Sequence, residues 1–132
     1  MKLSTKQKQQ LFFLLLAALW GVLIFYLSSV PDLKSGFPHS YDFVLRKFAH
    51  MFVFFVLTYF IASSFDSHKR GYLLLAIIAA VTYAMIDEFH QTFVSGRYGA
   101  PNDIFIDSIG VYFAIWFYKV RPPAKLFKKR FI

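Results

Sequence analysis

Four long apolar runs alternate with short polar segments along the chain. The first, 11–30, contains no charged residue and follows a polar, basic start. The other three, at 48–65, 72–92 and 103–118, are separated by short stretches rich in charge, glycine or proline. A helix of about 20 apolar residues crosses the roughly 30 Å hydrocarbon core of a bilayer. The pattern therefore predicts an all-α protein, a bundle of four transmembrane helices.

A cleaved secretory signal peptide is the alternative interpretation of the run 11–30. The apolar part of such a peptide usually has about 7–15 residues and is followed by an Ala-x-Ala-like site. This run is longer, and it ends in Ser28-Ser29-Val30-Pro31. We therefore expect the first helix to be retained in the mature protein.

Composition agrees with a membrane protein. Hydrophobic residues make up 58% of the 132 residues, and 18 residues are phenylalanine; soluble domains are about 45–50% apolar. A chain of this length is expected to form one domain. We assign residues 1–120 to a membrane domain and residues 121–132 to a basic tail. Cysteine is absent, which excludes disulfides and thiolate chemistry.

The basic residues, which give a net charge of +8, predict the orientation. Four crossings would place eleven Lys and Arg residues on one side: Lys2, Lys6, Lys8, Lys69, Arg70, Lys119, Arg121, Lys125, Lys128, Lys129 and Arg130. The other side would hold four: Lys34, Arg46, Lys47 and Arg97. Because cytoplasmic loops carry the excess of Lys and Arg, both termini and the turn 66–70 are predicted to be cytoplasmic. The expected location is the cell membrane, with multiple passes.

The basic tail has two interpretations. It can serve simply as a topology anchor. Its charges, on Lys125, Lys128, Lys129 and Arg130, would also attract anionic lipids, each by about 1 kcal/mol. Nucleic-acid binding is not expected, because no folded basic surface is left once the helices are placed.

Ionisable residues within the predicted helices gather at the outer end of the bundle. Lys47 and His50 are three residues apart, and Asp87 and Gln91 are four apart, so each pair shares a helix face. A charged group at the bilayer centre costs about 2.5–3.5 kcal/mol, which makes a functional site the first hypothesis for such a group. The candidate site comprises Lys47, His50, Asp87, Glu88, Gln91, Arg97, Asp103 and Asp107.

Several of these residues also have a purely structural interpretation. Asp103, after Pro101, would serve as the N-cap of the fourth helix. Asp87 and Glu88 would mark only the boundary with water. Lys47 would extend its ammonium group to the lipid head groups. None of these roles requires a ligand.

The remaining structural alternatives concern pairing inside the bundle. Arg97 would bind one of the acids at 87–88. His50 would be a hydrogen-bonded packing residue. Asp107, one turn inside its helix, would be the buried partner of Lys47 or Arg97. Only the tertiary structure can choose among these pairings.

At these residues the sequence resembles the VanZ-like family of small four-helix membrane proteins, named for a teicoplanin-resistance protein. The resemblance covers about 25–110 and is carried by Phe25-Tyr26-Leu27-Ser28-Ser29 with Pro31, Lys47-x-x-His50, Asp87-Glu88-x-x-Gln91-x-Phe93 with Gly96-Arg97, and Asp103, Asp107 and Gly110. Two positions depart from the family pattern. Asp107 stands where the family more often has Asn, and Ser95 replaces the usual Pro.

The resemblance implies a bacterial cell-envelope protein connected with tolerance to glycopeptide or lipoglycopeptide antibiotics. We therefore expect an outer-face site that binds or modifies an amphiphilic envelope molecule, such as a lipid-linked cell-wall precursor or a lipoglycopeptide. Lys47 and Arg97 would hold an anionic head group. His50 and one carboxyl from Asp87, Glu88 and Asp107 would act as acid or base.

Other kinds of function stay open at this point. A non-catalytic binding or partner-modulating protein would use the same polar cluster only for its shape, so the sequence does not decide whether the chain is an enzyme. Carboxylates and imidazoles at one face can bind a divalent ion, but no His-Glu-x-x-His or cysteine pattern is present and no metal ligands are assigned. Haem held by His50 and His90 is a further alternative. The sequence leaves open whether the protein has a cofactor.

Overall fold

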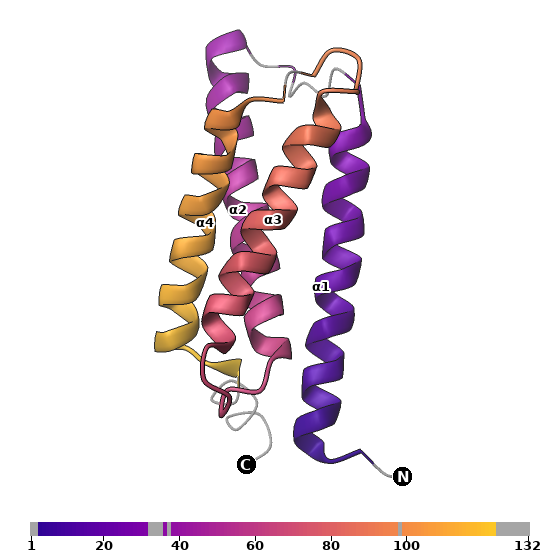
Figure 1. Cartoon of the computed structure of the whole chain (residues 1–132). Coiled ribbons are helices and arrows are strands. Elements are labelled where there is room, and N and C mark those ends of the chain that lie inside the picture. Colours follow the sequence, from indigo (N-terminus) through magenta and orange to yellow (C-terminus); the bar gives the residue numbers. More distant parts are fainter. Residues whose placement is uncertain (1–2, 32–35, 37, 98, 124–132) are drawn as a thin grey trace.

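A computed structural model describes residues 3–31, 36, 38–97 and 99–123, and these residues form four α-helices. The helices are α1 (Thr5–Ser29), α2 (His39–Ser64), α3 (Tyr72–Gln91) and α4 (Pro101–Val120). They run up and down in turn, so that α1 begins and α4 ends at the same end of the bundle (Figure 1). This end is called the terminal end below, and the opposite one the polar end. The all-helical prediction is confirmed for the described residues.

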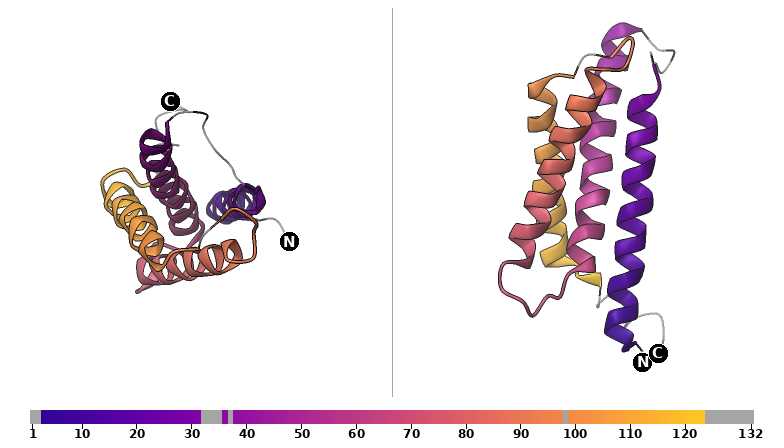
Figure 2. Two further views of the ribbon diagram at one scale, coloured as in Figure 1. Left: turned by 90° about the horizontal axis from the view of Figure 1, so that it is seen from above. Right: turned by 45° about the vertical axis from the view of Figure 1, so that its right-hand side comes forward.

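Helix α2 is the centre of the packing. It lies between α1 and α4, and α3 closes the bundle on the remaining side (Figure 2). The contacts between α2 and α4 are the most extensive, whereas α1 and α3 touch only sparsely. The α2–α4 contact is therefore the main helix–helix contact of the bundle.

Small residues allow the helices to approach closely. Ala76, Ala80 and Ala84 recur every fourth residue on α3 and are fully buried. On α4, a Cβ at Gly110 would overlap the carbonyl oxygen of Met51 on α2. Close backbone approach over small residues is typical of helix packing in membranes. The Gly110 contact matters for the site because Met51 directly follows His50 in the chain.

Three helices are long and apolar enough to cross a membrane: α1, α2 and α3. Helix α4 is not among them, and it carries Asp103 and Asp107 in its first half. Every helix exposes large apolar side chains, for example Leu19, Phe52 and Phe105. So much exposed apolar surface on a small domain is typical of a protein surrounded by lipid.

Two helices begin well before their predicted starts. Helix α2 begins at His39 instead of at residue 48. Asp42 lies in its first turn, where a negative charge interacts favourably with the helix dipole, and it forms an i,i+4 ion pair with Arg46. Both interactions stabilise this start of the helix. Helix α1 begins at Thr5 instead of 11, because Ser4 and Gln7 form a capping box. The hydropathy pattern missed both starts because these helical turns contain charged and polar residues.

The other boundaries differ less from the prediction. Helix α3 begins at Tyr72, as expected, and ends at Gln91, one residue before the predicted end. Helix α4 runs from Pro101 to Val120 instead of 103–118. Proline is well suited to the first turn of a helix, since its missing N–H has no intrahelical partner there.

At the terminal end, exposed polar contacts join neighbouring segments of the chain. Lys6 Nζ on α1 lies 2.5 Å from Asp66 Oδ1 in the turn between α2 and α3. The hydrogen bond from Lys6, assisted by the His68 backbone N–H, lowers the pKa of Asp66 below its usual value. The Tyr59 hydroxyl donates to the Arg121 carbonyl oxygen over 3.2 Å. Each partner at this end also has access to water.

Candidate functional site

Three helices each contribute one ionisable side chain to a buried cluster at the polar end. His50 comes from α2, Glu88 from α3 and Asp107 from α4. His50 Nδ1 lies 3.3 Å from Asp107 Oδ1 and 3.9 Å from Glu88 Oε1. One potential ligand atom from each residue lies within 4.8 Å of the other two. We call these three residues the acid–His triad.

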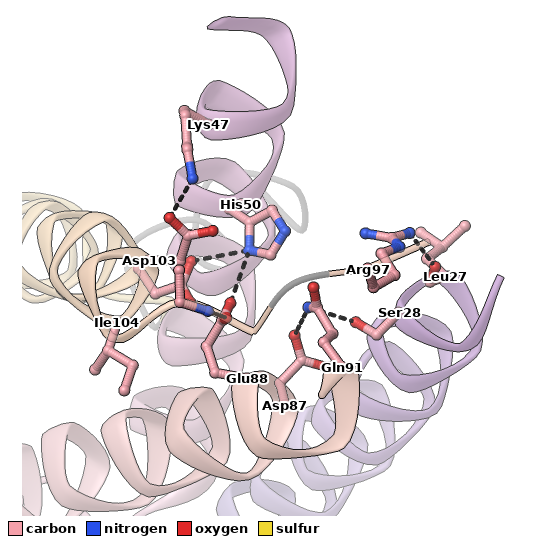
Figure 3. A network of polar contacts seen from close by, with 12 residues as sticks. Leu27, Ser28, Lys47, His50, Asp87, Glu88, Gln91, Arg97, Asp103 and Ile104 are labelled. Atoms are coloured by element: carbon pink, nitrogen blue, oxygen red, sulfur yellow. Dashed lines mark hydrogen bonds and ion pairs between the residues drawn. The ribbon is translucent and has the colours of Figure 1, made fainter. Parts of the chain in front are cut away.

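The triad is largely shielded from bulk water. The Asp107 side chain is 0% exposed, the Glu88 side chain 4% and the His50 side chain 13%. In Figure 3, His50 and Glu88 face one another across the gap between α2 and α3. Asp87 and Glu88 are both buried in the bundle, so neither side chain faces water.

The chain before α4 orients Glu88. The Ala100 backbone N–H donates to Glu88 Oε2 over 2.9 Å. Gly99 makes this possible, because a Cβ there would overlap the Glu88 carbonyl oxygen. The other carboxyl oxygen, Glu88 Oε1, is therefore directed toward His50. Sequence reasoning missed Gly99 and Ala100, which carry no functional group and contribute only backbone.

Lys47 and Asp103 form an ion pair beside the triad, joining α2 to α4 (Figure 3). The Lys47 ammonium also lies 5.0 Å from the centre of the Phe43 ring. Ala100, not Asp103, is the N-cap of α4, so the capping interpretation of Asp103 is wrong. Lys47 binds Asp103 and not Asp107, so the alternative that paired Lys47 with Asp107 is wrong.

A second polar group joins α3 to α1. Gln91 Nε2 donates to Asp87 Oδ2 over 2.9 Å and to the Ser28 hydroxyl over 3.4 Å. His90 stacks on Phe25 with ring centroids 4.3 Å apart, and its Nε2 lies 2.9 Å from the Ser29 hydroxyl oxygen. His90 therefore contacts α1 and is not part of the triad, which removes the basis for a haem shared with His50.

Arg97 donates to backbone carbonyls, and it forms no ion pair with any carboxylate among the described residues. Its Nε donates to the Val30 carbonyl oxygen over 3.2 Å and its Nη2 to that of Leu27 over 2.9 Å. These carbonyls lie at the C-terminal end of α1, where helix carbonyls lack intrahelical partners. Burial and nearby Arg46 lower the pKa of the guanidinium, which still stays protonated at neutral pH. The predicted pairing of Arg97 with an acid at 87–88 is not formed.

Several buried polar atoms lack hydrogen-bond partners among the described residues: His50 Nδ1, Asp87 Oδ1, Glu88 Oε1, Asp107 Oδ1 and Asp107 Oδ2. Likewise, no described Lys or Arg forms an ion pair with Asp87, Glu88 or Asp107. Buried polar atoms in native proteins are nearly always hydrogen-bonded. The arrangement is therefore suited to receiving protons, a cation or a donor group from a ligand.

An apolar pocket of 630 Å³ adjoins the triad between α3 and α4. Glu88 forms part of its wall, and the rest is mostly apolar: Thr82, Met85, Ile86, Phe89, Thr92, Gly99, Ala100, Pro101 and Ile104. Its volume is in the range of small-molecule sites. The sequence did not reveal this pocket, because its wall combines two helices with the segment between them.

Comparison with known proteins agrees with these motifs. No curated protein and no solved structure matches the chain. The family model described as VanZ/LLP1 matches residues 10–122. This match contains nearly all of the four helices, the acid–His triad and the residues that carried the VanZ-like resemblance. The chain is therefore a member of the VanZ/LLP1 family.

Proposed function

We propose that all four helices cross the bacterial cell membrane, with both termini in the cytoplasm. Helix α4 has 20 residues and packs along α2 and α3, and its two acids lie buried at the polar end instead of facing lipid. The described basic residues favour a cytoplasmic terminal end, because Lys6, Lys8, Lys69, Arg70, Lys119 and Arg121 lie there.

Part of the charge argument lies outside the described residues: Lys2, Lys34, Lys125, Lys128, Lys129 and Arg130. The membrane domain over 1–120 and the cytoplasmic tail over 121–132, with its attraction for anionic lipids, are part of the same proposal.

Cysteine labelling tests the orientation directly, since the chain has no native cysteine. Ser95→Cys and Ser67→Cys place one thiol beyond the polar end and one in the turn at the terminal end. A membrane-impermeant maleimide added to intact cells should label the Ser95→Cys variant only. The reverse pattern would place the site in the cytoplasm and overturn the orientation.

We further propose that the polar end binds or modifies the head group of an amphiphilic envelope molecule, either a lipid-linked cell-wall precursor or a lipoglycopeptide. The observation that carries this proposal is that Glu88 belongs both to the triad and to the wall of the apolar pocket. An amphiphile could place its apolar part between α3 and α4 while its head group contacts the triad. A role in glycopeptide tolerance follows from the family and is part of the proposal.

In this proposal the basic residues have roles different from those expected from the sequence. Lys47 is engaged with Asp103, and Arg97 with the end of α1. Both residues therefore act by positioning helices, and the triad itself is the candidate for head-group contact. His50 and Glu88 are the residues best placed to exchange a proton with a bound head group.

A non-catalytic binding or partner-modulating protein is the second candidate. It is favoured by the number of polar residues that already join helices to one another, such as Lys47 with Asp103 and Gln91 with Asp87 and Ser28. These links make a rigid surface at the polar end without requiring any reaction.

Antibiotic susceptibility of a producing bacterial host tests both candidates. His50→Ala and Glu88→Gln are compared with Asp66→Asn, an acid at the terminal end, with membrane levels measured by immunoblot. At equal abundance, loss of tolerance in both triad variants supports the site. If only His50→Ala fails, the site acts through shape, since the amide preserves the shape of Glu88. Unchanged tolerance in both variants would refute the site.

A further inference from the structure

We propose that His50, Glu88 and Asp107 bind a divalent transition-metal ion of the Zn²⁺ or Mn²⁺ class. No motif in the sequence marks this set, because its three ligands come from three helices. The inference concerns the same end of the bundle as the proposed function. It stands without that function, because it follows from the geometry and charge of the protein alone.

The distances suit a shared ion. Nitrogen and oxygen ligands lie about 2.0–2.2 Å from Zn²⁺, which separates neighbouring ligand atoms by about 3–3.5 Å. His50 Nδ1 and Asp107 Oδ1 are already 3.3 Å apart, and His50 Nδ1 and Glu88 Oε1 are 3.9 Å apart. Because no pair among the three atoms exceeds 4.8 Å, small side-chain rotations would complete the set.

The unpartnered atoms are an independent reason to expect a cation. Asp107 is fully buried, and neither of its carboxyl oxygens has a hydrogen-bond partner among the described residues. Glu88 Oε1 and His50 Nδ1 are also buried and unpartnered there. A buried charge that nothing compensates is costly in free energy. A divalent ion would satisfy these atoms and neutralise both carboxylates.

A neighbouring backbone group orients one member of the triad by a hydrogen bond, as is common for metal ligands. The Ala100 N–H binds Glu88 Oε2 and leaves Oε1 for coordination. Asp103 is held in a separate ion pair with Lys47 and is not counted among the ligands. Outer groups that orient ligating side chains in this way are typical of metal centres.

The donor set indicates the class of ion. One imidazole nitrogen with two carboxylates suits Zn²⁺ or Mn²⁺, whereas Mg²⁺ and Ca²⁺ prefer oxygen ligands alone. Three protein ligands leave at least one coordination position for water or for an oxygen of a ligand. An anionic head group could bind there, which would explain how it is held although Lys47 and Arg97 are engaged elsewhere.

Metal analysis of the full chain, purified in detergent without chelators, tests the proposal. We expect about one transition-metal ion per chain by mass spectrometry. Chelation should lower the thermal unfolding temperature, and Zn²⁺ or Mn²⁺, but not Mg²⁺, should restore it. Less than about a tenth of an ion per chain, with no effect of added Zn²⁺ or Mn²⁺ on unfolding, would overturn the proposal whether or not any variant folds.

Ligand variants locate the ion. His50→Ala and Asp107→Ala should lower metal content at least about tenfold. Asp42→Ala is the matched control, since Asp42 is also buried near the polar end but pairs with Arg46. Equal metal content in all three variants would overturn the assignment. A metal-free parent that still confers tolerance would refute only the ion, and a metal-bound parent that confers none would refute only the proposed function.

Discussion

The two ends of the bundle use similar residues in opposite environments. At the terminal end, Lys6 and Asp66 pair with side chains that are 47% and 32% exposed. At the polar end, Asp107 is 0% exposed and its nearest basic partner among the described residues is His50. Water satisfies spare lone pairs at the first end, but it cannot reach those of Asp107.

This difference teaches where a ligand has a physical reason to bind. An exposed ion pair contributes little to stability, and its loss leaves two solvated charges. A buried carboxylate whose oxygens accept no hydrogen bond costs free energy unless a proton, a cation or a donor group compensates it. The polar end therefore has a physical reason to bind a ligand, and the terminal end does not.

The largest effect is expected where α2 and α4 touch below the triad. Gly110→Ala should prevent stable folding, because its Cβ would overlap the backbone of Met51. Membrane abundance and thermal unfolding in detergent measure the effect. Gly21→Ala is the control, since a Cβ there would meet Tyr83 at an ordinary 3.6 Å. Equal stability of the two variants would contradict the close approach of α2 and α4.

The next effect compares one acid from each end. Asp107→Ala should abolish antibiotic tolerance at normal membrane abundance, because it removes a member of the triad. Asp66→Ala should leave tolerance unchanged, because it removes only an exposed carboxyl. Susceptibility assays on both variants measure the contrast. Equal behaviour of the two would show that burial does not distinguish the ends functionally.

A smaller effect is expected from the two lysine pairs. Lys47→Met should lower the free energy of unfolding by about 1–3 kcal/mol, since it leaves Asp103 largely buried and without its cation. Lys6→Met should cause no measurable change, because water replaces the contact. Chemical denaturation in detergent compares them. Combining Lys47→Met with Asp103→Leu should recover part of the loss; a double variant less stable than Lys47→Met would contradict the pairing.

The smallest effect concerns pH at the terminal end. The pKa of Asp66 is lowered by the Lys6 hydrogen bond, so its contribution to stability is present above the usual carboxyl pKa of 3.8. That contribution is lost as the pH falls through the lowered pKa. Asp66→Asn should remove this slight acid dependence, and high salt should weaken it in the parent. A pH dependence that is identical in parent and variant would exclude Asp66 as its source.

The sequence by itself determined the helical class, the apolar cores of the helices and the family. Runs such as 72–86 are long and continuous. The length of an apolar run decides whether a helix can span the hydrocarbon core, whichever helices it packs against. The spacing of Lys47 with His50 and of Asp87 with Gln91 also predicted that each pair shares one helix face. Local patterns were sufficient here because they report which residues share a helix or one face of it.

Only the tertiary structure decided which polar groups pair. Lys47 binds Asp103, Arg97 binds the end of α1, and Asp107 is left with His50. These pairings depend on how whole helices are rotated and shifted along their axes relative to one another. Gly110 on α4 and the buried alanines of α3 influence this arrangement, because small residues allow close contact between helices. A one-dimensional pattern contains no information on that arrangement, so neither the triad nor the pocket beside Glu88 could be read from it.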